Sequence, residues 1–286
     1  LDKSQVQKFT FMKLNLNSDL EEIIQNVDFF KPTYLVNFAA QGMVAESWIN
    51  PTHWYKTNVV SQVAFHDELR KRSFIKKYVH VTTPEVYGST DEGWIKESYQ
   101  FNPSTPYAVS RAACDLHLLS FFKAYDFPVV FTRAANVYGP GQQLYRVIPR
   151  ALLSTLTGKS FKLNGGGFSK RSFIYIEDVV NATIDITLKA EPGSSWHIST
   201  NQALTIRDLI HKICTFTAVD FQEIVDIDEE RLGKDQNYLL NSEKLRSIFN
   251  WNDKVNLDEG ISRTLNWVKC NLLILKKLPW KYIHKS

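Results

Sequence analysis

The chain is poor in the features that mark several classes of protein. Only three cysteines, Cys114, Cys214 and Cys270, occur in 286 residues. Their odd number and wide spacing indicate neither a disulfide framework nor a metal motif, so we expect a reducing, cytoplasmic compartment and no metal. The longest apolar runs fall short of about 18 residues, so neither a membrane span nor a membrane partner is expected. Cations are scattered among acids at a net charge of +4. Because they form no basic stripe, nucleic acid is not an expected partner.

What the chain has is an alternation of helical patterns and short apolar strands. In chain order we expect a helix at 20–30, a strand at 34–40, a helix at 59–71, a strand at 77–81, a helix at 107–125 and a strand at 128–132. This alternation predicts an α/β fold with a parallel sheet covered by helices on both faces. In such sheets ligands bind beyond the carboxyl ends of the strands.

The pattern changes after Gly139-Pro-Gly141. A Gly165-Gly-Gly167 turn, a short strand at 173–176 and helices at 206–216 and 257–268 come next. We therefore divide the chain into a first domain, 1–140, and a region, 141–286, that forms mainly a smaller α/β lobe, with segments returning to the first domain.

A strand end and a helix start carry the strongest chemical signal. The strand at 77–81 runs into Thr82-Thr-Pro-Glu85, and a helix opens with Tyr107-Ala-Val-Ser-Arg111. Tyr107 and Arg111, four residues apart, share one helix face. A cation there favours the phenolate, which predicts a lowered pKa for Tyr107 and a role as a base. Thr83 is placed to hydrogen-bond the same substrate hydroxyl.

Six segments in order resemble the extended short-chain dehydrogenases, and within them the nucleotide-sugar epimerases and 4,6-dehydratases. They are Val36-Asn-Phe-Ala-Ala-Gln41, Thr57-Asn58-Val59, Pro106-Tyr107-Ala-Val-Ser-Arg111, Arg133-Ala-Ala-Asn136-Val-Tyr-Gly-Pro140, Lys170-Arg171-Ser-Phe-Ile-Tyr-Ile-Glu-Asp178 and Glu230-Arg231-Leu-Gly-Lys-Asp235. The resemblance covers nearly the whole chain and implies a Rossmann-like, doubly wound first domain that binds a dinucleotide. It makes the second region a substrate-binding lobe.

The resemblance also implies ligands and the residues that hold them. The expected cofactor is NAD or NADP, bound by Asn15, Leu16, Ala39, Ala40, Gln41, Asn58, Tyr107 and Arg111. The expected substrate is a nucleotide-diphosphate sugar, bound by Asn136, Arg146, Arg171 and Arg231. Arginine suits a diphosphate because its planar guanidinium offers paired donors. The family further implies a homodimer packed through the helices at 59–71 and 107–125.

Glu85 distinguishes the branches of the resembled family. The 4,6-dehydratases carry a glutamate at this position, where it removes the C5 proton, so the catalytic set becomes Thr83, Glu85, Tyr107 and Arg111. A 4-epimerase or ketoreductase of the same fold is the first alternative, and a catalytically silent nucleotide-sugar binding subunit is the second.

Three departures from the family pattern keep these alternatives open. Pro84 stands where dehydratases have an acid or a serine, and Arg111 stands where they have lysine. The sequence also contains no Gly-x-x-Gly-x-x-Gly turn for the cofactor pyrophosphate. It begins near the family's third strand, about 50 residues late by the size of a βαβ unit, so we expect the native protein to be longer.

Overall fold

A four-stranded parallel sheet forms the centre of the molecule. The structure is a computed structural model that describes residues 6, 8–90, 93–230, 233 and 235–284. The strand order is β1-β2-β4-β9, with every pairing parallel. Register pairs Val36 with Val79, and Val79 with Val130. The predicted parallel sheet is confirmed, and the carboxyl ends of β1, β2 and β4 lie at one edge.

The described strands are β1 (Tyr34–Asn37), β2 (Lys77–Val81), β3 (Trp94–Ile95), β4 (Val129–Ala134), β5 (Asn136–Tyr138), β6 (Phe161–Asn164), β7 (Lys170–Arg171), β8 (Phe173–Tyr175), β9 (Ser195–Ile198), β10 (Leu204–Thr205), β11 (Val225–Asp228) and β12 (Leu239–Leu240). The α-helices are α2 (Leu20–Phe30), α3 (Pro51–Tyr55), α4 (Ser61–Leu69), α5 (Pro106–Tyr125), α6 (Val147–Thr157), α7 (Ile176–Lys189), α8 (Ile206–Thr217), α9 (Phe221–Ile224), α10 (Glu243–Phe249) and α11 (Leu257–Leu275). Single turns form η1 (Ala45–Trp48), η2 (Lys56–Val60), η3 (Pro84–Tyr87) and η4 (Gly165–Gly167).

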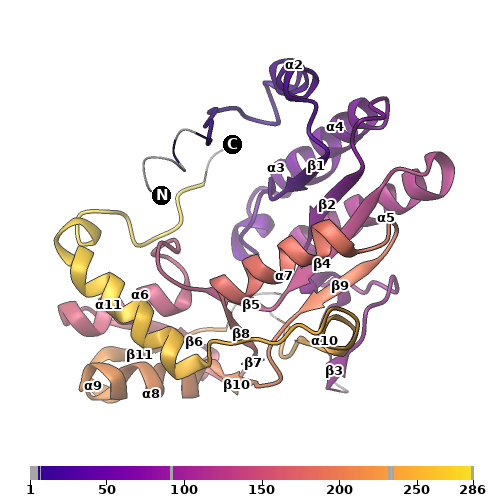
Figure 1. Ribbon diagram of the computed structural model, residues 1–286. Coiled ribbons are helices and arrows are strands. Elements are labelled where there is room, and N and C mark those ends of the chain that lie inside the picture. Colours follow the sequence, from indigo (N-terminus) through magenta and orange to yellow (C-terminus); the bar gives the residue numbers. More distant parts are fainter. Residues whose placement is uncertain (1–5, 7, 91–92, 231–232, 234, 285–286) are drawn as a thin grey trace.

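Helices cover both faces of the sheet, as Figure 1 shows. On one face α4 and α5 pack around Phe65, Leu118 and Phe131. On the other, α7 packs around Val130 and Ile186 in a separate core cluster. Alternating strand positions point to opposite faces, which is how one sheet supplies two cores.

The smaller lobe has a core of its own. It is built from α6, α8 and α11 around β6 and β11, which pair in parallel. Its buried residues include Leu152, Leu209 and Ile261. Between these elements the chain returns to the sheet, since β9 pairs with β4. The lobe therefore lies against the carboxyl edge of the sheet (Figure 1).

The predicted elements are present, and three of them differ clearly in extent. The helix expected at 257–268 continues to Leu275. The strand expected at 34–40 ends at Asn37, because the Asn37 side chain accepts a hydrogen bond from the amide of Ala39 and turns the chain. The helix expected at 59–71 is a π-turn, η2, continued by α4.

The outer side of β1 is apolar and uncovered in the part of the chain that the structure describes. There β1 pairs only with β2, and Tyr34, Val36 and Phe38 are exposed. On α7, Ile184 and Leu188 are exposed as well.

None of the described helices is both long and apolar enough to cross a bilayer.

Candidate active site

A cavity of about 850 Å³ lies between the carboxyl edge of the sheet and the smaller lobe. Six of the residues expected from the sequence line it. They are Thr83, Glu85, Tyr107, Asn136, Arg146 and Arg171. These side chains come from separate parts of the chain, and the fold brings them to one cavity.

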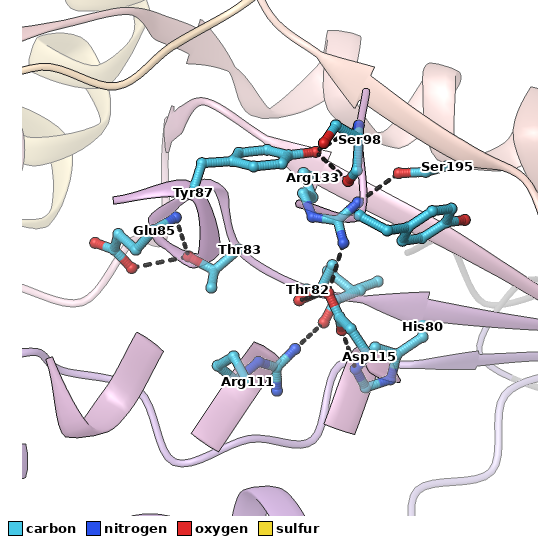
Figure 2. A network of polar contacts seen from close by, with 12 residues as sticks. His80, Thr82, Thr83, Glu85, Tyr87, Ser98, Arg111, Asp115, Arg133 and Ser195 are labelled. Carbon is cyan, nitrogen blue, oxygen red and sulfur yellow. Dashed lines mark hydrogen bonds and ion pairs between the residues drawn. The ribbon is translucent and has the colours of Figure 1, made fainter. Parts of the chain in front are cut away.

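Thr83 and Glu85 form a short turn directly after β2. Thr83 caps η3, and Pro84 occupies its first position, where a missing N–H costs nothing. The Thr83 hydroxyl donates to Glu85 Oε2 at 2.8 Å and accepts from the Glu85 amide at 3.4 Å (Figure 2). Burial raises the pKa of the Glu85 carboxyl, against the lowering effect of the Thr83 hydrogen bond and of the Arg171 charge. The raised pKa makes the Glu85 carboxylate a stronger base than an exposed glutamate.

Tyr107 lies in the first turn of α5, which begins at a well-formed cap. The Thr105 hydroxyl accepts from the amide of Ala108 at 3.1 Å, and the Ser47 hydroxyl accepts from the Tyr107 amide at 3.2 Å. The expected lowering of the Tyr107 pKa is wrong for the protein alone. Burial and the Glu85 charge raise the pKa of Tyr107, and outweigh the opposing effects of Arg111 and the Thr83 hydrogen bond.

Arg111 is buried and does not line the cavity. Its Nη2 donates to the carbonyl of Val81, which ties α5 to the end of β2 (Figure 2). Its Nε and Nη1 are buried without a hydrogen-bond partner. Buried guanidinium donors without partners are costly, so a ligand or ordered water is expected to meet them.

Asn58 joins the loop after β1 to the start of α5. Its side chain accepts from the Gln41 amide at 2.7 Å and donates to the Gln41 carbonyl at 3.0 Å. It also donates to the Ser110 hydroxyl at 3.0 Å. Asn58 is fully buried, so these bonds satisfy its amide, and the π-turn that carries it is a feature common at functional sites.

The C-terminal segment reaches the same loop. Gln41 Nε2 lies 3.2 Å from the hydroxyl of Tyr282 and 3.1 Å from His284 Nδ1. The His284 ring also stacks on Trp54 and lies 2.7 Å, nitrogen to nitrogen, from His53. The chain after α11 therefore runs back along the carboxyl edge of β1 (Figure 1).

The remaining residues expected at the cofactor lie outside the cavity. Asn15 is exposed just before α2, where its amide donates to Asp19, and Leu16 packs against the core beside α4. Ala39 and Ala40 are exposed after β1. These four residues flank the β1 edge of the sheet.

The arginines expected at the nucleotide differ in their surroundings. Arg171 is buried, and its guanidinium donates to the carbonyls of Asp235 and Gln236 at 2.6 and 2.9 Å. Arg171 thereby holds the 235–236 loop, and these guanidinium N–H groups are already used within the protein. Arg146 is exposed at the cavity, and Arg231 lies outside the described residues.

Sequence reasoning missed a buried ion pair and two cavity residues. Arg133 was expected in a phosphate-reaching segment, but its Nη2 donates to Asp115 at 2.6 Å, with both side chains fully buried (Figure 2). A charged residue in a buried strand needs a partner, and this requirement could have predicted the ion pair from the sequence. Tyr238 and Asp235 also line the cavity. Tyr238 donates to Asn136 at 3.1 Å.

The chain resembles known sugar-nucleotide enzymes over most of its length. Residues 1–264 match the family described as GDP-mannose 4,6 dehydratase. A trifunctional UDP-glucose 4,6-dehydratase/UDP-4-keto-6-deoxy-D-glucose 3,5-epimerase/UDP-4-keto-L-rhamnose-reductase of Arabidopsis thaliana is 30% identical over 270 residues, 92% of this chain and 40% of that protein. The dTDP-D-glucose 4,6-dehydratase of Mus musculus is 30% identical over 279 residues, 94% of this chain and 76% of that protein. The chain thus spans about two fifths of the length of the plant relative.

Solved structures agree with the fold. A dTDP-glucose 4,6-dehydratase from Streptomyces venezuelae, crystallised with NAD and TYD, matches with a TM-score of 0.88 and 26% identity over 94% of this chain and 83% of that one. A UDP-glucose 4-epimerase of Thermus thermophilus shares the fold, with a TM-score of 0.85 and 24% identity over 92% of this chain and 86% of that one.

Proposed function

This chain belongs to the GDP-mannose 4,6 dehydratase family, and we propose accordingly that it converts a nucleotide-diphosphate hexose to the 4-keto-6-deoxy sugar. The observation that carries the proposal is the cavity shared by Thr83, Glu85 and Tyr107. The relatives named 4,6-dehydratases support it, as does the raised pKa that burial gives Glu85.

NAD or NADP is the cofactor of this proposal. The dehydratases of Streptomyces venezuelae and Bacillus anthracis were crystallised with NAD. The residues present fit the nicotinamide-ribose end, because the buried Arg111 Nε and Nη1 lack partners that a ribose hydroxyl would supply. Gln41 and Asn58 would border that end, and Asn15 the adenine. When bound, the oxidised cofactor would take hydride from C4 of the sugar, supply it again at C6 and place a positive charge near Tyr107.

The chain's own residues would move the protons. Tyr107, as the phenolate, would remove the proton of the 4-hydroxyl while Thr83 hydrogen-bonds the same oxygen. With C4 oxidised, Glu85 would take the C5 proton. The electrons of that C–H bond form the C5–C6 double bond as the C6–oxygen bond breaks. Since Pro84 has no proton to give, Glu85 would pass the C5 proton to the departing hydroxyl, which leaves as water. As C6 is reduced, C5 would regain a proton, equivalent to the one that Tyr107 took from the 4-hydroxyl, so the protons balance.

The nucleotide half would lie against the smaller lobe. Arg146 is exposed at the cavity, where its guanidinium suits a diphosphate. Arg171 would contribute partly by holding the loop at 235–236 in place. Asn136 would contribute by accepting the hydrogen bond that positions Tyr238. Arg231 completes the proposed set on the strength of its motif alone.

A 4-epimerase or ketoreductase remains the second candidate, and Pro84 is the observation that favours it. Neither activity removes water, so neither needs an acid at position 84. A catalytically silent binding subunit is the third candidate. It is favoured by the contacts of Tyr282 and His284 with Gln41, because they bring the C-terminal segment to a residue expected to bind the cofactor.

We also propose a homodimer in a reducing, cytoplasmic setting. Val60, Val109 and Leu116 are exposed apolar side chains on η2 and α5, at the helices expected to pair. Burying them against a second copy would stabilise the assembly. The three cysteines are free, which suits a reducing compartment.

The test compares two variants of the protein that carries this chain at its native length. Glu85→Gln is expected to lower formation of the 4-keto product by about 10²–10⁴-fold, because it removes the C5 base. Tyr107→Phe is expected to stop oxidation at C4 as well. Glu177→Gln, an exposed glutamate on α7, is the control. Unchanged keto product in Glu85→Gln rejects Glu85 as the C5 base. Turnover without any keto product, abolished in Tyr107→Phe but kept in Glu85→Gln, supports the epimerase or reductase.

A further inference from the structure

Two histidines and a cysteine converge in the core beneath the active site. His66 lies on α4, His80 on β2 and Cys114 on α5, and all three are fully buried. One ring nitrogen of each histidine and the Cys114 sulfur lie within 4.8 Å of one another. The three residues come from separate elements, so their spacing in the sequence does not predict the cluster.

The ring nitrogens of the two histidines differ in their contacts. His66 Nε2 lies 2.8 Å from the hydroxyl of Tyr78. His80 Nε2 faces Asp115 Oδ1 at 3.4 Å (Figure 2). The Nδ1 atom of each histidine is buried without a hydrogen-bond partner, and His80 Nε2 also makes no hydrogen bond at its distance from Asp115. A histidine that binds a metal through one nitrogen commonly holds a carboxylate or another polar group with the other.

Burial lowers the pKa of both His66 and His80, which favours the neutral rings over the charged ones. Burial also raises the pKa of the Cys114 thiol to about 12. Without a cation, the cluster therefore holds a neutral thiol whose proton an incoming ion must displace.

Neighbouring charges select the kind of cation. The Arg111 guanidinium acts on all three residues, and the nearest carboxylate, Asp115, is already paired with Arg133. A divalent ion bound to one thiolate would add a net positive charge beside Arg111, whereas a monovalent ion would add none. Thiolate and imidazole are ligands that soft ions such as Cu(I) accept.

We propose that His66 Nδ1, His80 Nδ1 and Cys114 Sγ bind a single monovalent, thiophilic cation, Cu(I), with three-fold coordination. On binding, the Cys114 S–H bond breaks, the proton leaves to solvent and the sulfur lone pair bonds to copper, without electron transfer. The ion would fasten α4 to β2, which leads into Thr83, and to α5, which carries Tyr107.

The experiment uses the full chain in a Cys270→Ser background, because Cys270 is an exposed thiol. The protein is refolded from denaturant with Cu(I) under anaerobic, reducing conditions and dialysed against a Cu(I) chelator. Chelator-resistant copper of one ion per chain is expected. Cys114→Ser is expected to lose it. Cys214→Ser, which alters the other buried cysteine, in α8 of the smaller lobe, is expected to keep it.

Two further measurements keep the test decisive should Cys114→Ser fail to fold. X-ray absorption of the copper-loaded background protein is expected to show one sulfur and two nitrogen ligands. His66→Leu keeps the core filled but removes a ligand, and is expected to weaken copper retention about tenfold or more. The proposal is overturned if no copper resists the chelator, if the copper shell lacks sulfur, or if His66→Leu retains copper as well as the background protein does.

Discussion

Removing Asp115 tests whether the buried ion pair holds the frame of the active site. Asp115 on α5 accepts from Arg133 on β4 at 2.6 Å, and both side chains are fully buried. Asp115→Ala leaves the guanidinium with Ser195 as its remaining side-chain hydrogen-bond acceptor among the described residues and with the rings of Tyr87 and Phe101 at 5.3 and 5.2 Å. An uncompensated buried charge costs about 3–5 kcal/mol of unfolding free energy.

The loss is measured by urea denaturation followed by tryptophan fluorescence. For a chain of this size a loss of about 3–5 kcal/mol corresponds to a fall in Tm of about 5–8 °C. The double variant Asp115→Leu/Arg133→Met removes both charges and is expected to recover most of the loss, since apolar side chains of similar volume replace a buried pair at little cost. Asp185→Ala, which breaks an exposed pair with Lys189 on α7, is the control and is expected to cost less than about 1 kcal/mol. An Asp115→Ala variant no less stable than Asp185→Ala, or a double variant as unstable as the single one, would show that the pair does not hold this frame.

Three further substitutions give distinct outcomes. Gly260→Ala would place a Cβ 2.0 Å from the Tyr138 hydroxyl. It is expected to lower the free energy of unfolding by about 1–3 kcal/mol, measured by urea denaturation. An unchanged denaturation midpoint would contradict the close approach of α11 to β5. Burial lowers the pKa of His197 to about 3, against an ordinary value of 6.5. Between these two pH values the unfolded chain binds one more proton than the folded chain, so the free energy of unfolding falls as the pH falls from 6.5 toward 3. His197→Gln is expected to flatten that slope by up to about 1.4 kcal/mol per pH unit. An equal slope in both proteins would contradict the lowered pKa of His197. Pro84→Asp supplies an acid beside Glu85 and is expected to raise the rate of 4-keto product formation about tenfold or more. An unchanged rate would show that Glu85 alone suffices to protonate the leaving hydroxyl.

The sheet and its helices could be predicted from the sequence because periodicity reports burial directly. β2 and α2 have the predicted limits, and the resemblance found in six motifs is confirmed by the family match over residues 1–264. The residues that line the cavity could also be predicted, since parallel strands bring the residues beyond their carboxyl ends to one edge.

Other features depend on energies that only the packed molecule determines. The direction of the Tyr107 pKa required knowing that burial and Glu85 outweigh Arg111. The orientation of Arg171 required the carbonyls of a loop more than 60 residues later in the chain. The ion pair of Arg133 joins two elements with no sequence relation, and the end of β1 depends on a single Asn37 contact.

A 4,6-dehydratase must oxidise C4, remove a proton at C5 and reduce C6 of the same sugar within one cavity. The most direct test supplies nucleotide-hexoses labelled with deuterium at C4 to the protein of native length and traces the label by NMR. We expect a 4-keto product with the deuterium at C6. Deuterium that stays at C4, in an inverted sugar or in unchanged substrate, would contradict the proposed dehydration.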